Sequence, residues 1–165
     1  TSITTTGSAF IFQLGALTAA TMTSETTAQE RTVTHSYLWT NAMVVALGAV
    51  TAGDISVATL PAKTQVVDAA VVITGAAAGP ATVTVACGRT SATYIDYIVA
   101  SDAKATANTV YGNAAAERGT NLTGFDLPSY TAPTTVYCHF ISTGANLGTV
   151  TGSTGRVILT TRLMP

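Results

Sequence analysis

Charge is what this sequence lacks most. Of its 165 residues, 7 are Lys or Arg and 8 are Asp or Glu, which leaves a net charge of −1. Proteins that bind nucleic acids normally carry a concentrated basic patch or stripe, so the composition argues against nucleic acid as a partner. Lys and Glu are also the residues that usually keep a free surface soluble. We therefore expect other subunits to cover much of the surface.

Long hydrophobic runs are missing as well. The most apolar early stretch, residues 9–20, contains Gln13 and is shorter than the roughly 20 residues that a membrane-spanning helix needs. No positive residues precede it, as they would in a secretory signal peptide. The sequence thus predicts no membrane partner and favours synthesis in a cytoplasm without secretion. We expect the glycosylation sequon at Asn121 to be unused.

Residues that carry out catalysis or bind metals are few and scattered. The two histidines, His35 and His139, lie far apart in the sequence, and the two cysteines form no C-x-x-C pair. Calcium-loop, phosphate-loop and nucleophile-elbow patterns are absent. We expect His35 to be a hydrogen-bonded histidine of the core or of an interface. We expect no catalytic residue, no metal or cofactor site and no enzymatic activity.

Strand-like alternation is the main feature present, and it is clearest in residues 53–74. Two segments rich in β-branched residues flank the break Leu60-Pro61-Ala62-Lys63. Proline fixes φ and removes a ladder donor, so the pattern predicts two strands that meet at a turn or crossover. The residues expected to share a face are Ile55, Val57 and Thr59 in the first strand, and Val67, Ala69, Val71 and Ile73 in the second.

Six further stretches have strand character at spacings typical of all-β sandwiches: residues 31–39, 43–47, 81–87, 94–100, 134–142 and 156–164. No long amphipathic helices alternate with them, which argues against βαβ folds. The expected fold is therefore all-β, an antiparallel β-sandwich, with an eight-stranded jelly roll as the first choice. An immunoglobulin-like sandwich is the alternative, but Trp39 precedes both cysteines and the Cys–Trp–Cys order is missing.

Both cysteines fall on faces that should point inward. Cys87 alternates in phase with Val83 and Val85, and Cys138 lies in phase with its apolar neighbours two residues away on each side. The two could bridge if their strands are neighbours, but synthesis in a cytoplasm favours buried free thiols.

Two regions fall outside the regular pattern. Residues 1–30 are predicted to form an extended or partly ordered N-terminal arm, beside a single domain of residues 31–165, with a short strand in residues 8–14. A partly disordered terminus is the alternative. Residues 101–133 form a long irregular loop with helical turns expected at 103–107 and 114–118. We expect any working surface in the arm and this loop, and the arm's candidate partner-binding residues are Phe10, Ile11, Phe12 and Leu14.

Three segments, AGDISVATLPAKTQVVDAAVVIT, ATVTVACG and RVILTTRLMP, resemble small structural proteins of tailed bacteriophages, above all the capsid decoration (cement) proteins. The resemblance implies a virion protein that binds the outer surface of an expanded head and bridges capsid subunits. It implies the major capsid protein as partner, location on the virion surface, and a homo-oligomer, with a trimer favoured over a dimer. No binding residue is carried over, because the resemblance lies in core positions.

Two other functions remain open from the sequence. The first is another virion component, such as a tail, fibre or head–tail connector subunit. The second is a carbohydrate-binding or adhesion module, for which aromatic side chains would form the sugar platform. Candidates for that platform are Trp39, Tyr94, Tyr97, Tyr111 and Tyr130.

Overall fold

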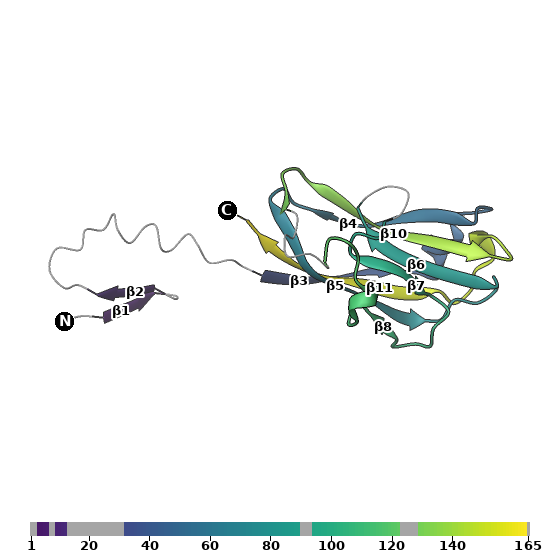
Figure 1. Cartoon of the computed structure of the whole chain (residues 1–165), viewed down its shortest axis with the longest axis horizontal. Coiled ribbons are helices and arrows are strands. Elements are labelled where there is room, and N and C mark those ends of the chain that lie inside the picture. The colour runs from purple at the N-terminus through teal and green to yellow at the C-terminus, as the bar shows by residue number, and fades with distance from the viewer. Residues whose placement is uncertain (1–2, 7–8, 13–31, 90–93, 123–128, 165) are drawn as a thin grey trace. The chain divides into compact units, whose positions relative to one another are not determined.

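The computed structural model describes residues 3–6, 9–12, 32–89, 94–122 and 129–164. The chain divides into two compact units, residues 1–31 with 165 and residues 32–164 (Figure 1). Among the described residues, no helix is long and apolar enough to cross a membrane.

The N-terminal unit contains two short antiparallel strands, β1 (Ile3–Thr6) and β2 (Ala9–Phe12). In their register Ile3 lies opposite Phe12 and Thr6 lies opposite Ala9. The strand expected in residues 8–14 is thus present over Ala9–Phe12, paired with a strand that the sequence did not indicate. Three of the four candidate arm residues lie in β2, and Leu14 lies outside the described residues.

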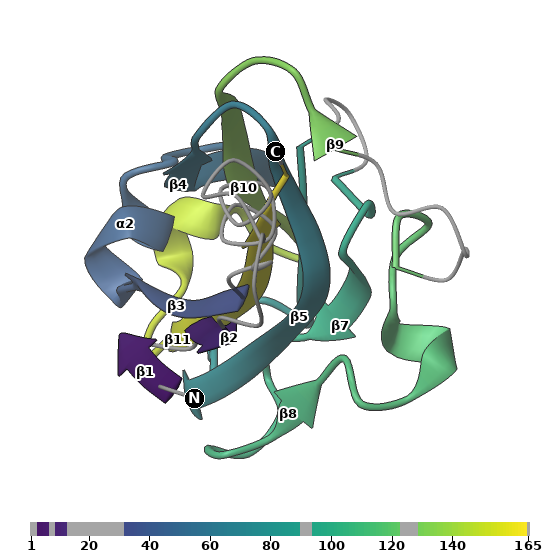
Figure 2. The same ribbon diagram turned by 90° about the vertical axis from the view of Figure 1, so that its left-hand side faces the viewer.

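The larger unit is mostly β, with two antiparallel sheets. One sheet has the order β3-β11-β5-β8, and β9 also pairs with β5; the other has the order β4-β10-β6-β7. In Figure 2, β3 and β11 are labelled below β4 and β10, and β5 curves from the upper level to the lower one. The strands are β3 (Thr32–Trp39), β4 (Ala52–Leu60), β5 (Thr64–Gly75), β6 (Thr82–Gly88), β7 (Ile98–Asp102), β8 (Val110–Tyr111), β9 (Ser129–Tyr130), β10 (Thr134–Thr143) and β11 (Thr154–Leu163).

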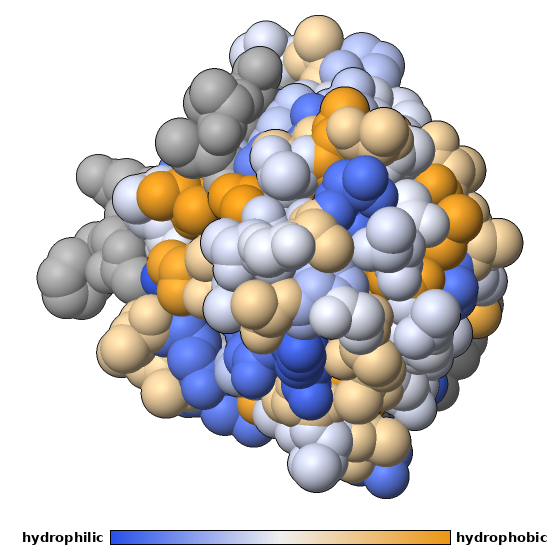
Figure 3. Space-filling view, turned by 90° about the vertical axis from the view of Figure 1, so that its right-hand side faces the viewer, coloured by the Kyte–Doolittle hydropathy of each residue, from blue (hydrophilic) through white to orange (hydrophobic). Residues whose placement is uncertain are grey.

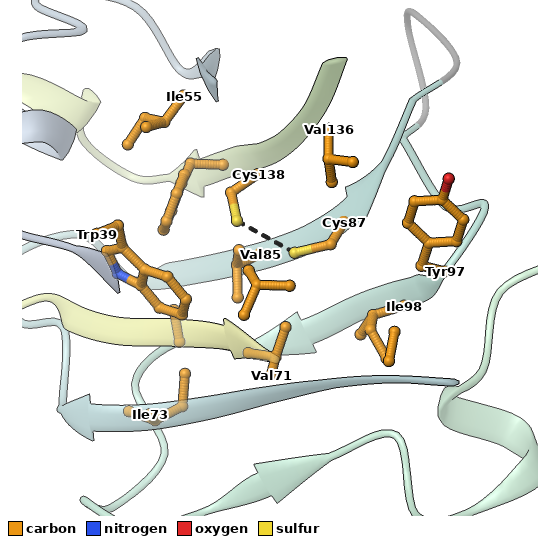
Figure 4. Packing of buried hydrophobic residues seen from close by; sticks show 14 of the residues in the cluster. Trp39, Ile55, Val71, Ile73, Val85, Cys87, Tyr97, Ile98, Val136 and Cys138 are labelled. Carbon is orange, nitrogen blue, oxygen red and sulfur yellow. Dashed lines mark hydrogen bonds between the residues drawn. The ribbon is translucent and has the colours of Figure 1, made fainter. Parts of the chain in front are cut away.

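Both sheets contribute to one cluster of buried hydrophobic side chains (Figure 4). Trp39 from one sheet meets Phe140 from the other edge to face, with ring centroids 5.7 Å apart. Full burial of a Val, Leu or Phe side chain stabilises the fold by about 1.5–3 kcal/mol, so this shared core supplies much of its stability. The largest fully buried side chains include Trp39, Leu60, Ile73, Tyr97, Ile98, Phe140, Leu147 and Leu159.

The inward faces of β6 and β10 agree with the alternation of the sequence. Val83, Val85 and Cys87 are fully buried, and so are Val136, Cys138 and Phe140. Thr82, on the opposite face of β6, is exposed. These predictions are confirmed.

The segment between β4 and β5 carries the chain from one sheet to the other, since β4 pairs with β10 and β5 pairs with β11. It is therefore a crossover, one of the two forms that the sequence predicted. Lys63 adopts a positive φ of 60° there, and its carbonyl accepts a hydrogen bond from the Met164 backbone N–H. The end of β11 is thus tied to the crossover.

The predicted face of β4 is wrong beyond Ile55. The register against β10 shifts between Ser56 and Ala58, which leaves Val57 as an extra residue. A bulge of one residue reverses the alternation that follows it. As a result Ala58 and Leu60 are buried and Thr59 is exposed.

A second register shift affects β5. Val66 lies opposite Thr161 and Asp68 lies opposite Thr160, so Val67 is the extra residue. Val67 is only half-buried while Val66 is buried, which corrects the predicted position of Val67. Beyond the bulge the prediction is confirmed, with Ala69, Val71 and Ile73 buried.

The strand predicted for residues 43–47 is wrong, because this run forms the helix α2 (Asn41–Val45). The Val44 backbone N–H donates to the carbonyl of Thr40, and Val44 is the helix's one buried residue. A short apolar run does not by itself distinguish a strand from a helix. Two 3₁₀ turns complete the fold, η1 (Ala115–Glu117), within the turn predicted at 114–118, and η2 (Leu147–Thr149).

The strand predicted for residues 94–100 begins later, since β7 spans Ile98–Asp102. Tyr94 has a positive φ of 46°, a conformation that interrupts an extended strand.

We expect Val71→Asp to prevent folding. Val71 is fully buried between the sheets, and an unpaired charge there should cost more than about 4 kcal/mol, a large part of the roughly 5–15 kcal/mol that holds a domain together. Circular dichroism and urea unfolding measure this. The matched control Val110→Asp changes an exposed valine and should cost less than about 1 kcal/mol. A normally folded Val71→Asp protein would contradict the assigned face of β5.

Candidate functional site

Strand β3 lies at the end of its sheet and pairs in the described structure with β11 alone. The pairing runs without a register shift, from Trp39 opposite Gly155 to Thr32 opposite Arg162. Trp39 is buried and Tyr37 is half-buried, whereas the other six residues of the strand are exposed. We call Thr32–Trp39, with its unpaired side, the β3 edge.

One row of the β3 edge faces the same way as the core. Val33, His35 and Tyr37 alternate in phase with Trp39, and they lie opposite buried residues of β11. Val33 and His35 are nonetheless exposed. The inner face of the sheet therefore continues past the part that the described residues cover. The buried partners on β11 are Val157, Leu159 and Thr161.

The position of His35 corrects one prediction. Its side chain is exposed and stacks on Tyr37, with ring centroids 6.0 Å apart and planes 28° apart. The prediction that His35 belongs to the core is thus wrong, because β3 is an edge strand and its outer part lies beyond the core. The alternative, an interface histidine, stays a prediction.

Within the described residues, the β3 edge lacks several features that often prevent edge strands from pairing with other chains. Those features are Lys and other charged residues, Pro and bulges. The strand TVTHSYLW contains no Lys, Arg, Asp, Glu or Pro, and its register is unbroken. Leu38, on the face opposite Trp39, is 66% exposed. This edge can accept a further strand through its backbone groups and its apolar side chains.

A second group of side chains lies on the outer face of the other sheet. His139 Nδ1 and Asp54 Oδ1 are 2.5 Å apart, on residues that lie opposite each other in β10 and β4. The ring of Tyr94 lies 5.4 Å from that of His139 and 5.1 Å from that of Tyr137. The His139 side chain is 12% exposed and that of Asp54 is 37% exposed.

This arrangement can orient an imidazole, and neither cysteine lies beside it as a nucleophile. In triad chemistry a Ser or Cys lies on the other ring nitrogen of the histidine, and both cysteines point instead into the core. Among the residues that the structure describes, no group of three or more His, Cys, Asp or Glu could hold a metal ion. The contact links β4 to β10 on the outer face of the sheet.

Four of the five aromatic residues proposed as a sugar platform have described side chains, and these four are buried or half-buried. Trp39 and Tyr97 are buried in the core, and Tyr94 is only 7% exposed. Tyr111 is half-buried and donates its hydroxyl hydrogen to the carbonyl of Asp102. The side chain of Tyr130 lies outside the described residues.

The described part of the irregular segment is held against the sheets. Arg118 forms an ion pair of 2.9 Å with Asp68 on β5 and donates through Nε to the carbonyl of Gly112. The Glu117 carboxylate accepts hydrogen bonds from the backbone N–H groups of Ala114 and Gly112, which lower its pKa. These contacts fix the loop near β5, and a partner for it stays a prediction.

Comparison with known proteins gave no family model that matches the chain, no similar curated protein and no similar solved structure.

We expect Asp54 and His139 to be energetically coupled. In a double-mutant cycle with Asp54→Asn and His139→Gln, the coupling free energy should be about 0.5–1.5 kcal/mol, a modest value because Asp54 is partly in solvent. Urea unfolding of the parent, the two single variants and the double variant measures it. Additive effects would show that the short contact does not stabilise the pairing of β4 with β10.

Proposed function

We propose that this protein is a virion structural protein, a capsid decoration (cement) protein that binds the outer surface of an expanded phage head. The observation that carries the proposal is the β3 edge, which among the described residues pairs on one side alone, contains no Lys, Arg, Asp or Glu, and lies next to an exposed part of the sheet's inner face. Such an edge exposes a free monomer to aggregation, whereas it is useful in a protein that acts inside an assembly.

We also propose that the two sheets form a jelly-roll sandwich, and the strand order supports this. If β9 is left aside, the other eight strands of the larger unit can be ranked in chain order. One sheet then takes the first, eighth, third and sixth strands, and the other takes the second, seventh, fourth and fifth. This interleaving is the order of a jelly roll, an architecture found in viral capsid proteins and also in lectins.

The surface composition agrees with a protein embedded among copies of itself and of a shell. On the face seen in Figure 3, residues of near-neutral hydropathy cover much of the surface and apolar residues gather in several places among them. Among the described residues of the larger unit, seven large apolar residues are exposed, two of them on β3. Charged residues are depleted in the buried core of protein interfaces, so a surface with few charges and exposed apolar residues suits an interface. The exposed large apolar residues are Val33, Leu38, Val45, Val50, Val110, Ile141 and Leu163.

We assign the β3 edge to contacts between copies of the protein. Pairing of two β3 strands across a two-fold axis would give a dimer, whereas contact of β3 with a different surface of the next copy would close a trimer. The resemblance to cement proteins favours the trimer. In either case the neutral strand allows approach without like-charge repulsion.

We assign the N-terminal unit to the major capsid protein. An isolated pair of strands is at best marginally stable in water, so β1 and β2 would gain stability by docking on a partner. Phe10, Ile11, Phe12 and Leu14 are the proposed anchors. Contacts that bridge subunits only after expansion would hold neighbouring capsid proteins together against the pressure of packaged DNA.

Ser36→Lys should weaken self-association at least about tenfold, because it places a charge in the middle of the uncharged β3 edge. Sedimentation equilibrium measures the association constant. Ala107→Lys adds the same charge at an exposed turn away from β3 and serves as the matched control. Equal association of both variants and the parent would exclude the β3 edge as the contact between copies.

The function is tested by adding the purified chain to expanded empty shells of the virus that encodes it. We expect binding at micromolar concentration and a higher melting temperature of the shells, with weaker binding after deletion of residues 1–14, which should leave the larger unit folded. Cosedimentation and calorimetry measure these effects. Failure of the intact chain to bind would contradict the proposal. Detection of the protein in tails or connectors would instead assign it to another virion component. If the truncated protein is unfolded, the prediction that residues 1–14 form an arm outside the folded domain is wrong.

A further inference from the structure

The two cysteines face each other at the centre of a sheet. Cys87 lies on β6 and Cys138 on β10, the two inner strands of the order β4-β10-β6-β7. They are opposite each other in the register, and their Sγ atoms are 3.1 Å apart (Figure 4). Both are free thiols and fully buried.

The backbone already has a spacing that suits a disulfide. Residues directly opposite each other in antiparallel strands have Cα atoms about 4.5–5.5 Å apart, within the roughly 4.4–6.8 Å that disulfides require. A bond length of about 2.05 Å needs the sulfur atoms to approach by about 1 Å. Small side-chain rotations supply such a movement, so the pairing of β6 with β10 can stay as it is.

The surroundings leave the two thiols little chemistry except with each other. The part of the chain that the structure describes brings no metal-binding group of three His, Cys, Asp or Glu together. The neighbours of the pair on the same face are apolar, namely Val85, Val136 and Phe140, all fully buried. A nucleophilic or metal-binding role would need access that this position does not give.

We propose that Cys87 and Cys138 are a latent disulfide site. The two cysteines are thiols in a reducing cytoplasm and form a disulfide bond when the chain meets a small-molecule disulfide. One cysteine thiolate attacks a sulfur of glutathione disulfide, forms a mixed disulfide and releases one glutathione thiolate. The second cysteine then attacks the mixed disulfide and releases another. The protein loses two electrons and two protons, and two glutathione molecules take them up as thiols.

Burial controls when the bond forms. It raises the pKa of the Cys138 thiol, and the hydrogen bond with Cys87 raises that pKa further. Since the thiolate is the reactive form, the two buried thiols react slowly while the protein is folded. The bond forms during folding or during transient opening of the sheet, and the same burial then protects it from reduction.

The bond would restrain the unfolded chain strongly, because it joins residues 51 positions apart. Closure of a loop of this length should raise the melting temperature by about 5–15 °C. The site itself is independent of the proposed function. If the protein is a decoration protein as proposed, the disulfide bond would stabilise it after the particle leaves the cell.

The test uses the intact chain without capsids, so its result is independent of shell binding. The protein is unfolded and refolded either with a glutathione redox buffer or with dithiothreitol, and free thiols are then alkylated in denaturant and counted by mass spectrometry. We expect no free thiol, a monomeric mass lower by two hydrogens and the higher melting temperature in the first case. Dithiothreitol added during unfolding should reverse all three.

Cys87→Ala and Cys138→Ala are the matched controls, and each should show one thiol and the same melting temperature in both buffers. Two alkylated thiols in the parent protein refolded with glutathione disulfide would overturn the proposal, as would disulfides formed only between molecules. The thiol count of the parent decides the matter even if a variant fails to fold.

Discussion

The contact between the inner faces of the two sheets is the interaction on which the rest of the structure depends. Strands β5, β6, β10 and β11 give their inward rows to a single apolar core. Trp39 and Phe140 link the sheets at one side of that core. Charged residues are few in this chain, and the ion pair between Arg118 and Asp68 is partly exposed, where such pairs contribute little to stability.

The limits of the core explain the candidate interaction surface. Where the shared core ends, the inward row of β3 continues and leaves Val33 and His35 exposed, although their partners on β11 are buried. An exposed inward row beside a strand edge that no described residue pairs is costly for an isolated protein and suits an assembly. This combination, together with the strand order, supports the proposal of a decoration protein more strongly than any single side chain does.

Alternation in the sequence predicted local structure well and spatial relations poorly. It located β6 and β10, their buried faces and both inward cysteines, because period-2 burial leaves a direct record in the residue order. It failed at Val57 and Val67, where a single extra residue reverses the faces. It also could not separate the helix α2 from a strand. Whether a strand lies at the centre or at an edge depends on pairing between distant segments, so the exposure of His35 and its neighbours was not predictable. The contact of Asp54 with His139 depends on the same long-range register.

Amide hydrogen exchange along β3, measured in the free protein and again in the proposed assembly, shows whether the β3 edge is the contact surface. We expect backbone amides on the unpaired side of β3 to exchange rapidly in the free protein and to become strongly protected on assembly, while the protection of β6 and β10 changes little. Equally rapid exchange along β3 in both states would contradict the assignment of this edge as the contact surface.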